Sequence, residues 1–174
     1  FKQKINGKPL VYLDSANSSQ KPKAVIDRLS SFYETEFSNV GRSVHTLAVR
    51  ATNRFEATRD MLKKYINAQH REEIIFTKGA TESINLVASS YGDKYINEGD
   101  EILITELEHH SNYVPWHFIR KNKGAVIKFA PINKNGEVEI DEIKKLISNK
   151  TKIIAITHIS NVTGAVMPIK KIVD

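Results

Sequence analysis

The residues best suited to bind an anion lie at positions 74–86, where the sequence reads IIFTKGATESINL. The apolar run Ile74–Phe76 predicts a short buried strand, followed by a glycine turn and then a helix. The first backbone N–H groups of a helix lack helical acceptors, and the positive end of the helix dipole adds to their attraction for anions. Small and hydroxyl side chains, which leave room for an anion or donate to it, stand where this helix begins: Gly79, Ala80, Thr81 and Ser83.

This segment predicts a phosphate site, although an ordinary strand-to-helix turn with a threonine cap would have the same pattern. It matches neither G-x-G-x-x-G nor G-x-x-x-x-G-K-[ST], the two common nucleotide-binding patterns. We therefore expect the phosphate to belong to a ligand other than a dinucleotide or a nucleoside triphosphate.

Polar residues also follow two other predicted strands. Residues 105–112 read TELEHHSN after Ile102–Ile104, and residues 157–164 read THISNVTG after Ile153–Ile156. Because ligands of open parallel sheets bind beyond the carboxyl ends of the strands, we expect all three polar segments to face one edge. Such an edge could hold a phosphate, stack a histidine on a flat ring and offer an asparagine amide. Pyridoxal 5′-phosphate, a phosphorylated planar cofactor, is the main candidate.

Each of these residues also has a simpler interpretation. His109 and His110 could cap a helix, and Asn161 before Gly164 could be plain turn chemistry. A zinc site from the histidines at 109, 110 and 117 is disfavoured, because the chain has neither H-E-x-x-H spacing nor cysteine. We expect no metal here.

The chain alternates between predicted helices and strands, which implies parallel pairing through right-handed crossovers. The predicted fold is α/β, with a mostly parallel sheet flanked by helices. Helices are expected over residues 21–37, 46–68, 81–91, 112–123 and from Asp141, and the third and fourth should end at Gly92 and Gly124. Strands are expected at Ile102–Ile104, Val126–Pro131 and Ile153–Ile156, with a turn at Asn135-Gly136.

Composition excludes several classes of protein. The 174 residues suffice for one domain with a core, and no apolar run reaches the ~18 residues of a membrane span. The absence of cysteine excludes disulfides and thiolate sites. The net charge of +6 is spread along the chain without a basic block, which does not favour nucleic acid. We expect a cytoplasmic protein with neither a nucleic-acid nor a membrane partner.

Five segments resemble the class V aminotransferase family, and within it the SUF-type cysteine desulfurases and the related selenocysteine lyases. They cover the chain in the family's order. They are Val11–Ala16 with Ser19–Pro22, Arg42–Leu47, Phe76–Glu82, Glu108–Asn112 with Val114–Trp116, and Thr157–Gly164.

The resemblance implies a role for individual residues. Thr81 and the N–H of Ala80 would bind the phosphate of pyridoxal 5′-phosphate. His109, the predicted catalytic residue, would stack on the pyridine ring and relay protons. Asn161 would contact the ring hydroxyl oxygen and the substrate carboxylate, and Ala16 and His45 would lie near the substrate.

The resemblance also implies a domain plan and a reaction. Residues 1–20 would be an N-terminal segment contributing to the active site or small domain, and residues 21–174 an incomplete large domain of fold type I. The reaction would convert L-cysteine to L-alanine and leave the sulfur as an enzyme persulfide for iron–sulfur cluster assembly. The partners would be a second subunit in a homodimer and a sulfur-acceptor protein.

Several family features are missing or altered. The Schiff-base lysine, the aspartate of the pyridine nitrogen and the acceptor cysteine would lie beyond Asp174, where a helix starting at Pro168 has barely begun. We therefore expect a piece of a longer protein that is inactive alone. Two rival functions are a selenocysteine lyase or another class V aminotransferase, and a non-catalytic interaction module. Four positions in substrate-side loops depart from the family: Ser15, Asn17, Gly41 and Ser43.

Overall fold

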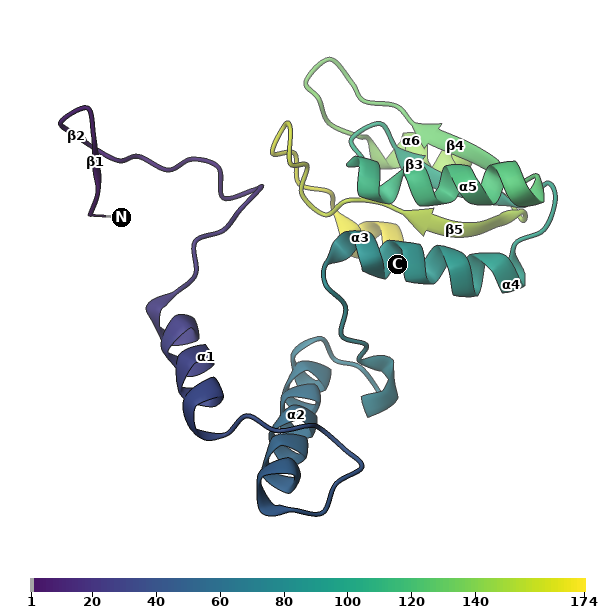
Figure 1. Cartoon of the computed structure of the whole chain (residues 1–174). Coiled ribbons are helices and arrows are strands. Elements are labelled where there is room, and N and C mark those ends of the chain that lie inside the picture. The colour runs from purple at the N-terminus through teal and green to yellow at the C-terminus, as the bar shows by residue number, and fades with distance from the viewer. Residues whose placement is uncertain (1) are drawn as a thin grey trace. The chain divides into compact units, whose positions relative to one another are not determined.

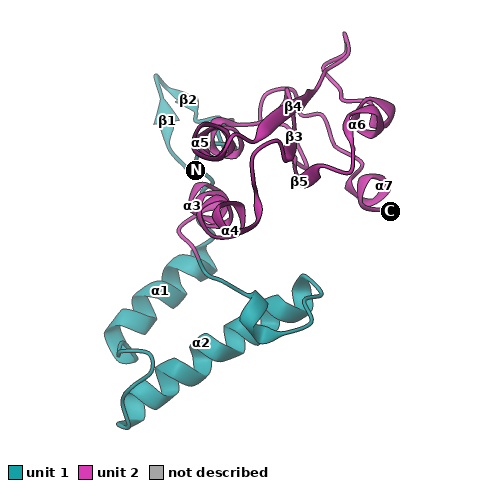
Figure 2. Cartoon of the chain, turned by 90° about the vertical axis from the view of Figure 1, so that its right-hand side faces the viewer, with its two compact units in different colours: residues 1–76 teal, residues 77–174 magenta. Residues whose placement is uncertain are grey.

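The computed structural model describes residues 2–174, and the chain divides into two compact units (Figure 2). The first unit comprises residues 1–76 and the second residues 77–174. The predicted division between residues 20 and 21 does not coincide with this boundary and stays a prediction.

The first unit is mostly helical. A short antiparallel hairpin pairs β1 (Lys4–Ile5) with β2 (Lys8–Pro9). Helices α1 (Lys23–Thr35) and α2 (Thr46–Tyr65) follow, and then the 3₁₀ turn η1 (Arg71–Glu73). Both long helices confirm the helical spacing seen in the sequence.

The segment after η1 departs from the prediction. Ile74 is buried and extended, but Ile75 is 65% exposed and Phe76 42% exposed, and no strand of the described chain pairs with them. The guanidinium of Arg59 on α2 lies 5.2 Å from the ring centre of Phe55 and 5.0 Å from that of Phe76, and it donates to the carbonyl of Ile74. The predicted buried strand is therefore wrong, because a side chain rather than a neighbouring strand meets this backbone.

The second unit is built on a parallel three-stranded sheet (Figure 1). Its strands are β3 (Glu101–Thr105), β4 (Val126–Ala130) and β5 (Thr151–Ala155), in the order β4-β3-β5. The central strand β3 is buried along its whole length, since it has a neighbour on each side and helices on both faces. The α/β fold with a parallel sheet is confirmed.

Helices cover both faces of the sheet (Figure 2), and a separate hydrophobic core lies on each face. Ile102 and Ile104 pack with α5 (Val114–Lys123) and the helix before β3, whereas Leu103 packs with α6 (Ile140–Leu146). This division follows from the alternation of side chains along a strand. The last helix, α7 (Ile169–Val173), begins after Pro168 as predicted and lies with α6.

The helix before β3 is longer than predicted. Helix α3 (Ala80–Val87) continues through a π-helical turn, η2 (Ala88–Gly92), into α4 (Asp93–Tyr95). Gly92 does not end the helix: it has helical dihedrals and is buried, and a Cβ there would stand 3.2 Å from Ile119 Cδ1 of α5. The glycine is there for close packing between helices.

Two further predictions concern helix ends. Gly124 ends α5 in the left-handed region, with φ of 74°, as its position indicates. Asp141 does not cap α6, because the helix begins one residue earlier, with Glu139 as its N-cap and no side-chain cap bond. Asp141 instead lies in the first turn, where its charge suits the helix dipole.

Candidate active site

Three segments gather at the carboxyl end of the sheet (Figure 1). They are the start of α3, the segment 106–113 after β3, and the segment 156–168 after β5. Helix α3 contacts the 3₁₀ turn η3 (His110–Asn112), so the first two segments are neighbours. The meeting of these segments at one edge, expected from the sequence, is observed.

The start of α3 offers unpaired N–H groups. Its first helical hydrogen bond runs from the N–H of Ser83 to the carbonyl of Gly79, at 3.1 Å. In the described chain, the N–H groups of Ala80, Thr81 and Glu82 and the hydroxyl of Thr81 make no hydrogen bond. The space beside Gly79 is open to 4 Å. These donors can bind a phosphate.

The hydroxyl of Ser83, the other candidate donor, is used within the turn. Ser83 Oγ lies 2.7 Å from Thr77 Oγ1 and donates to the carbonyl of Gly79 at 3.2 Å. Glu82 folds back, and its Oε2 accepts from the N–H of Lys78 at 2.5 Å. These bonds fix the shape of the turn and leave Thr81 as the hydroxyl available to a ligand.

His109 is both a cap and an exposed ring. It is the N-cap of η3, and its Nδ1 accepts from the N–H of Ser111 at 3.2 Å and lies 2.9 Å from Ser111 Oγ. Because Nδ1 is an acceptor, the proton of the neutral ring belongs on Nε2. The capping interpretation and the ring-stacking interpretation of His109 are therefore compatible, since the cap fixes the ring and leaves it exposed.

Asn161 lies on a tightly ordered turn. The residues before and after it pair in an antiparallel bridge between Ile159 and Val166. The buried Ser160 accepts hydrogen bonds at its Oγ from the N–H groups two and three positions later, at 3.3 and 3.2 Å. The Asn161 amide is exposed and makes no hydrogen bond in the described chain. A rigid loop thus presents an unused amide.

Two glutamates hold the segment after β3 in place, and neither had a predicted role. Glu108 Oε1 accepts from the Thr105 hydroxyl at 2.7 Å and from the N–H of Thr157 at 2.9 Å. Glu106 reaches the other way, toward the turn after β4, where its Oε2 accepts from the N–H of Ile132 at 3.0 Å. The signal in the sequence was a pair of carboxylates around the buried Leu107, directly after a buried strand.

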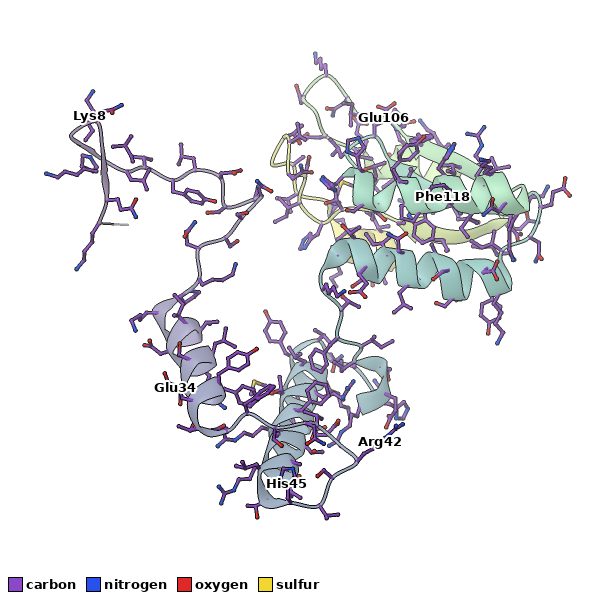
Figure 3. All side chains as sticks on the ribbon, viewed as in Figure 1. Lys8, Glu34, Arg42, His45, Glu106 and Phe118 are labelled. Atoms are coloured by element: carbon purple, nitrogen blue, oxygen red, sulfur yellow. The ribbon has the colours of Figure 1, made fainter. Side chains whose placement is uncertain are left out.

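Ala16 and His45 belong to the first unit. His45 stands at the start of α2 (Figure 3), where its Nδ1 accepts from the N–H of Ala48 at 3.3 Å. Its position is explained by helix capping. The predicted closeness of Ala16 and His45 to a substrate stays a prediction.

The described residues contain no cluster of three or more metal-ligating side chains. Within the same residues, no helix has both the length and the apolar character that crossing a membrane requires.

Residues 11–174 match the family model described as aminotransferase class-V. The chain belongs to the class-V aminotransferase family. It is 51% identical over 172 residues to a probable cysteine desulfurase of Halalkalibacterium halodurans, covering 99% of this chain and 42% of that protein. A probable cysteine desulfurase of Staphylococcus aureus strain Mu50 is 54% identical over 162 residues, which cover 93% of this chain and 39% of the relative.

Solved structures agree with this membership. The cysteine desulfurase CsdA of Escherichia coli superposes with a TM-score of 0.80 at 37% identity, over 93% of this chain and 41% of that one. The apo cysteine desulfurase of Thermococcus onnurineus NA1 gives a TM-score of 0.87 at 33% identity, over 93% and 40%. The chain is thus a cysteine desulfurase homologue that spans about two fifths of the length of these relatives.

The family depends on pyridoxal 5′-phosphate, and the residues at the sheet edge fit that cofactor. A phosphate needs several donors, and the start of α3 offers free N–H groups with the hydroxyl of Thr81. A pyridine ring needs a flat partner, and His109 presents an exposed imidazole whose orientation is fixed by Ser111. Asn161 adds an amide that can both donate and accept.

Proposed function

We propose that this sequence belongs to a pyridoxal-phosphate-dependent cysteine desulfurase, which converts L-cysteine to L-alanine and transfers the sulfur to an enzyme cysteine. The observation that carries the proposal is the meeting of three segments at one sheet edge. These segments bear the donors at the start of α3, the ring of His109 and the amide of Asn161. The similarity to named cysteine desulfurases supports it.

Each group has a distinct task in this proposal. Thr81 and the N–H of Ala80 bind the cofactor phosphate and so fix the ligand's position along the edge. His109 stacks on the ring, and because Ser111 occupies Nδ1 it takes or gives a proton at Nε2. Asn161 orients the substrate carboxylate. The cofactor itself, when bound, withdraws electrons from the substrate α-carbon and makes its proton acidic.

The group that accepts the substrate sulfur must lie outside these residues. A cysteine thiolate attacks the substrate sulfur, so that an S–S bond forms as the C–S bond breaks, and the three-carbon product takes up a proton to become alanine. The 174 residues contain no cysteine, so we expect them to form no persulfide alone. The proposal also places Ala16 and His45 near the substrate. It includes assembly as a homodimer and transfer of the sulfur to an acceptor protein for iron–sulfur cluster assembly.

The test uses the intact protein and two ligands, pyridoxal 5′-phosphate and phosphate-free pyridoxal. Thr81→Val keeps the side-chain shape but removes the hydroxyl, and one hydrogen bond to a charged group corresponds to about a tenfold or larger loss of affinity. We expect Thr81→Val to weaken binding of pyridoxal 5′-phosphate by at least that factor and to leave pyridoxal binding unchanged. Fluorescence titration measures both.

Ser89→Ala is the matched control, because Ser89 is an exposed hydroxyl farther along the same helical run, in η2. It should leave both affinities unchanged. Alanine formation from L-cysteine by the wild type, dependent on added cofactor, is the second requirement. If the wild type releases no alanine, or binds pyridoxal as tightly as its phosphate ester, the proposal fails. Faster turnover of L-selenocysteine than of L-cysteine would favour the lyase alternative.

A further inference from the structure

We propose that Glu108 is a positioning residue of this site, whose carboxylate holds the His109 segment against the Asn161 loop and is the final acceptor of a hydrogen-bond relay behind them. The inference rests on the proposed function, because only there do His109 and Asn161 act on one ligand. It assigns a task to a residue that touches no ligand itself.

Glu108 joins the two segments that carry the proposed ligand contacts. Its Oε1 accepts from the N–H of Thr157, at 2.9 Å. Within the described chain, no other hydrogen bond links residues 106–113 with residues 157–168. The same oxygen accepts from the hydroxyl of Thr105, at 2.7 Å, and Thr105 is 1% exposed at the end of β3. The carboxylate is thus anchored to the rigid strand on one side and holds the loop on the other.

The second oxygen of Glu108 ends a relay with a fixed direction. The indole N–H of Trp116 can only donate, and it donates to Asn112 Oδ1 at 3.0 Å. This contact turns the Asn112 amide so that Nδ2 donates to Glu108 Oε2 at 2.7 Å. Because Trp116 is 2% exposed, the relay has a rigid origin in the core.

All three groups around Glu108 donate, so the position requires an acceptor at both oxygens. A carboxylate accepts at both, whereas a glutamine amide would set an N–H₂ group against a donor in either orientation. Rotating Asn112 would not relieve this, because its own N–H₂ would then face the Trp116 N–H. No lysine or arginine of the described chain pairs with Glu108, so geometry rather than neutralisation explains the carboxylate.

The primary test is Glu108→Gln in the intact protein loaded with pyridoxal 5′-phosphate. We expect kcat for alanine formation to fall about tenfold or more, as a displaced catalytic group would cause, while KM changes by less than about threefold. The circular dichroism of the bound cofactor should change, because the ring partner moves. A purely structural role would lower the melting temperature and leave the cofactor signal and kcat of the folded fraction intact.

A reciprocal exchange provides the rescue. In Glu108→Gln/Asn112→Asp the net charge is unchanged, Gln Oε1 accepts from Thr105 and Thr157, and the new aspartate accepts from both Trp116 and the glutamine. Every donor is paired again, so kcat and the cofactor signal should return to near wild type. Asn112→Asp alone sets two carboxylates together and should be impaired. Glu106→Gln is the matched control, since one accepting oxygen serves its contact with Ile132.

The outcomes separate the two proposals. A wild type that forms no alanine overturns the proposed function and this inference with it. An active wild type with an unchanged Glu108→Gln variant overturns the role of Glu108 alone. If Glu108→Gln does not fold, the double variant decides: near-normal kcat supports the relay, and a folded but impaired double variant overturns it.

Discussion

One glutamate opens β3 and another lies just past its end, and different kinds of donor hold the two carboxylates. Glu101 opens the strand and accepts from Ser148 Oγ at 2.6 Å, from Thr151 Oγ1 at 3.1 Å and from the Lys128 ammonium at 2.8 Å. Glu108, just past the other end, also accepts three hydrogen bonds. Its donors are a hydroxyl, an amide and a backbone N–H, and none is a cation.

The difference shows how the two ends of one strand can contribute separately, one to the stability of the fold and the other to the candidate active site. At the amino end, a cation neutralises Glu101, and the hydrogen bond from Lys128, followed by that from Ser148, lowers the pKa of its carboxyl below the ordinary 4.5. At the carboxyl end, directional bonds to neutral groups set positions without neutralising the charge. Ligands bind at the carboxyl edges of parallel sheets, so directional contacts lie where they can arrange loops.

The largest expected effect comes from the strand between the two ends. Leu103 is fully buried, and Leu103→Ala should lower the free energy of unfolding by about 2–5 kcal/mol, because it removes apolar contacts and leaves a cavity. It should also weaken binding of pyridoxal 5′-phosphate, since Thr105 at the end of β3 anchors Glu108 in the segment that follows. Chemical denaturation and cofactor titration of the intact protein measure the two effects.

Ile154 on β5 is the matched control for this strand variant, because it lies beside Leu103 in register but is 38% exposed. Ile154→Ala should lower the free energy of unfolding much less than Leu103→Ala. Equal losses from the two variants would show that burial of β3 does not decide the stability of this unit.

A pH series separates the two glutamates. Because the pKa of folded Glu101 is lowered, its ionised form stabilises the fold above the unfolded value of 4.5, and this contribution is lost as the pH falls through the folded pKa. The Glu101→Gln variant should therefore have a lower melting temperature than the wild type at neutral pH. The two melting temperatures should converge as the pH falls below 4.5. Binding of pyridoxal 5′-phosphate at neutral pH should be unchanged.

Glu142→Gln is the control for the paired carboxylate, since Glu142 pairs with the exposed Lys145 on α6. Exposed ion pairs contribute little, so this variant should follow the wild type throughout the pH range. A Glu101→Gln variant that lowered kcat and changed the circular dichroism of the bound cofactor as much as Glu108→Gln would remove the distinction between the two ends.

Local patterns predicted much of this fold. The apolar runs gave the three strands of the sheet, and the alternation with helices gave their parallel pairing. Gly124 and the Asn135-Gly136 turn were also predictable, because a left-handed residue at a helix end or a tight turn favours glycine. Features that depend on a residue distant in the sequence could not be predicted. Gly92 looked like a helix end until the approach of Ile119 explained it, and Ile74–Phe76 lacked the neighbour that a strand needs.

The site divides in the same way. The segments of His109 and Asn161 could be predicted to meet, because they follow parallel strands whose ends share one edge. For the segment of Thr81 the same expectation rested on a strand at Ile74–Phe76 that the structure does not contain. Their individual roles stay predictions. Glu108 was not foreseen, because its task depends on which backbone N–H of another strand lies within reach, and the sequence alone does not show that.

The smallest expected effect concerns the loop after β4 at the carboxyl end. Gly136 has φ of +75°, and a Cβ there would stand 3.3 Å from Thr163 Cγ2 in the Asn161 loop. Gly136→Ala should cost about 1 kcal/mol of stability through left-handed strain and should raise KM for L-cysteine, because it pushes on that loop. Gly7, with φ of +77° and open space around it, tests strain alone, so Gly7→Ala should leave KM unchanged. If both variants shift KM alike, backbone strain rather than contact with the Asn161 loop is responsible. The substitution at the carboxyl end of the sheet would then have no specific effect on KM.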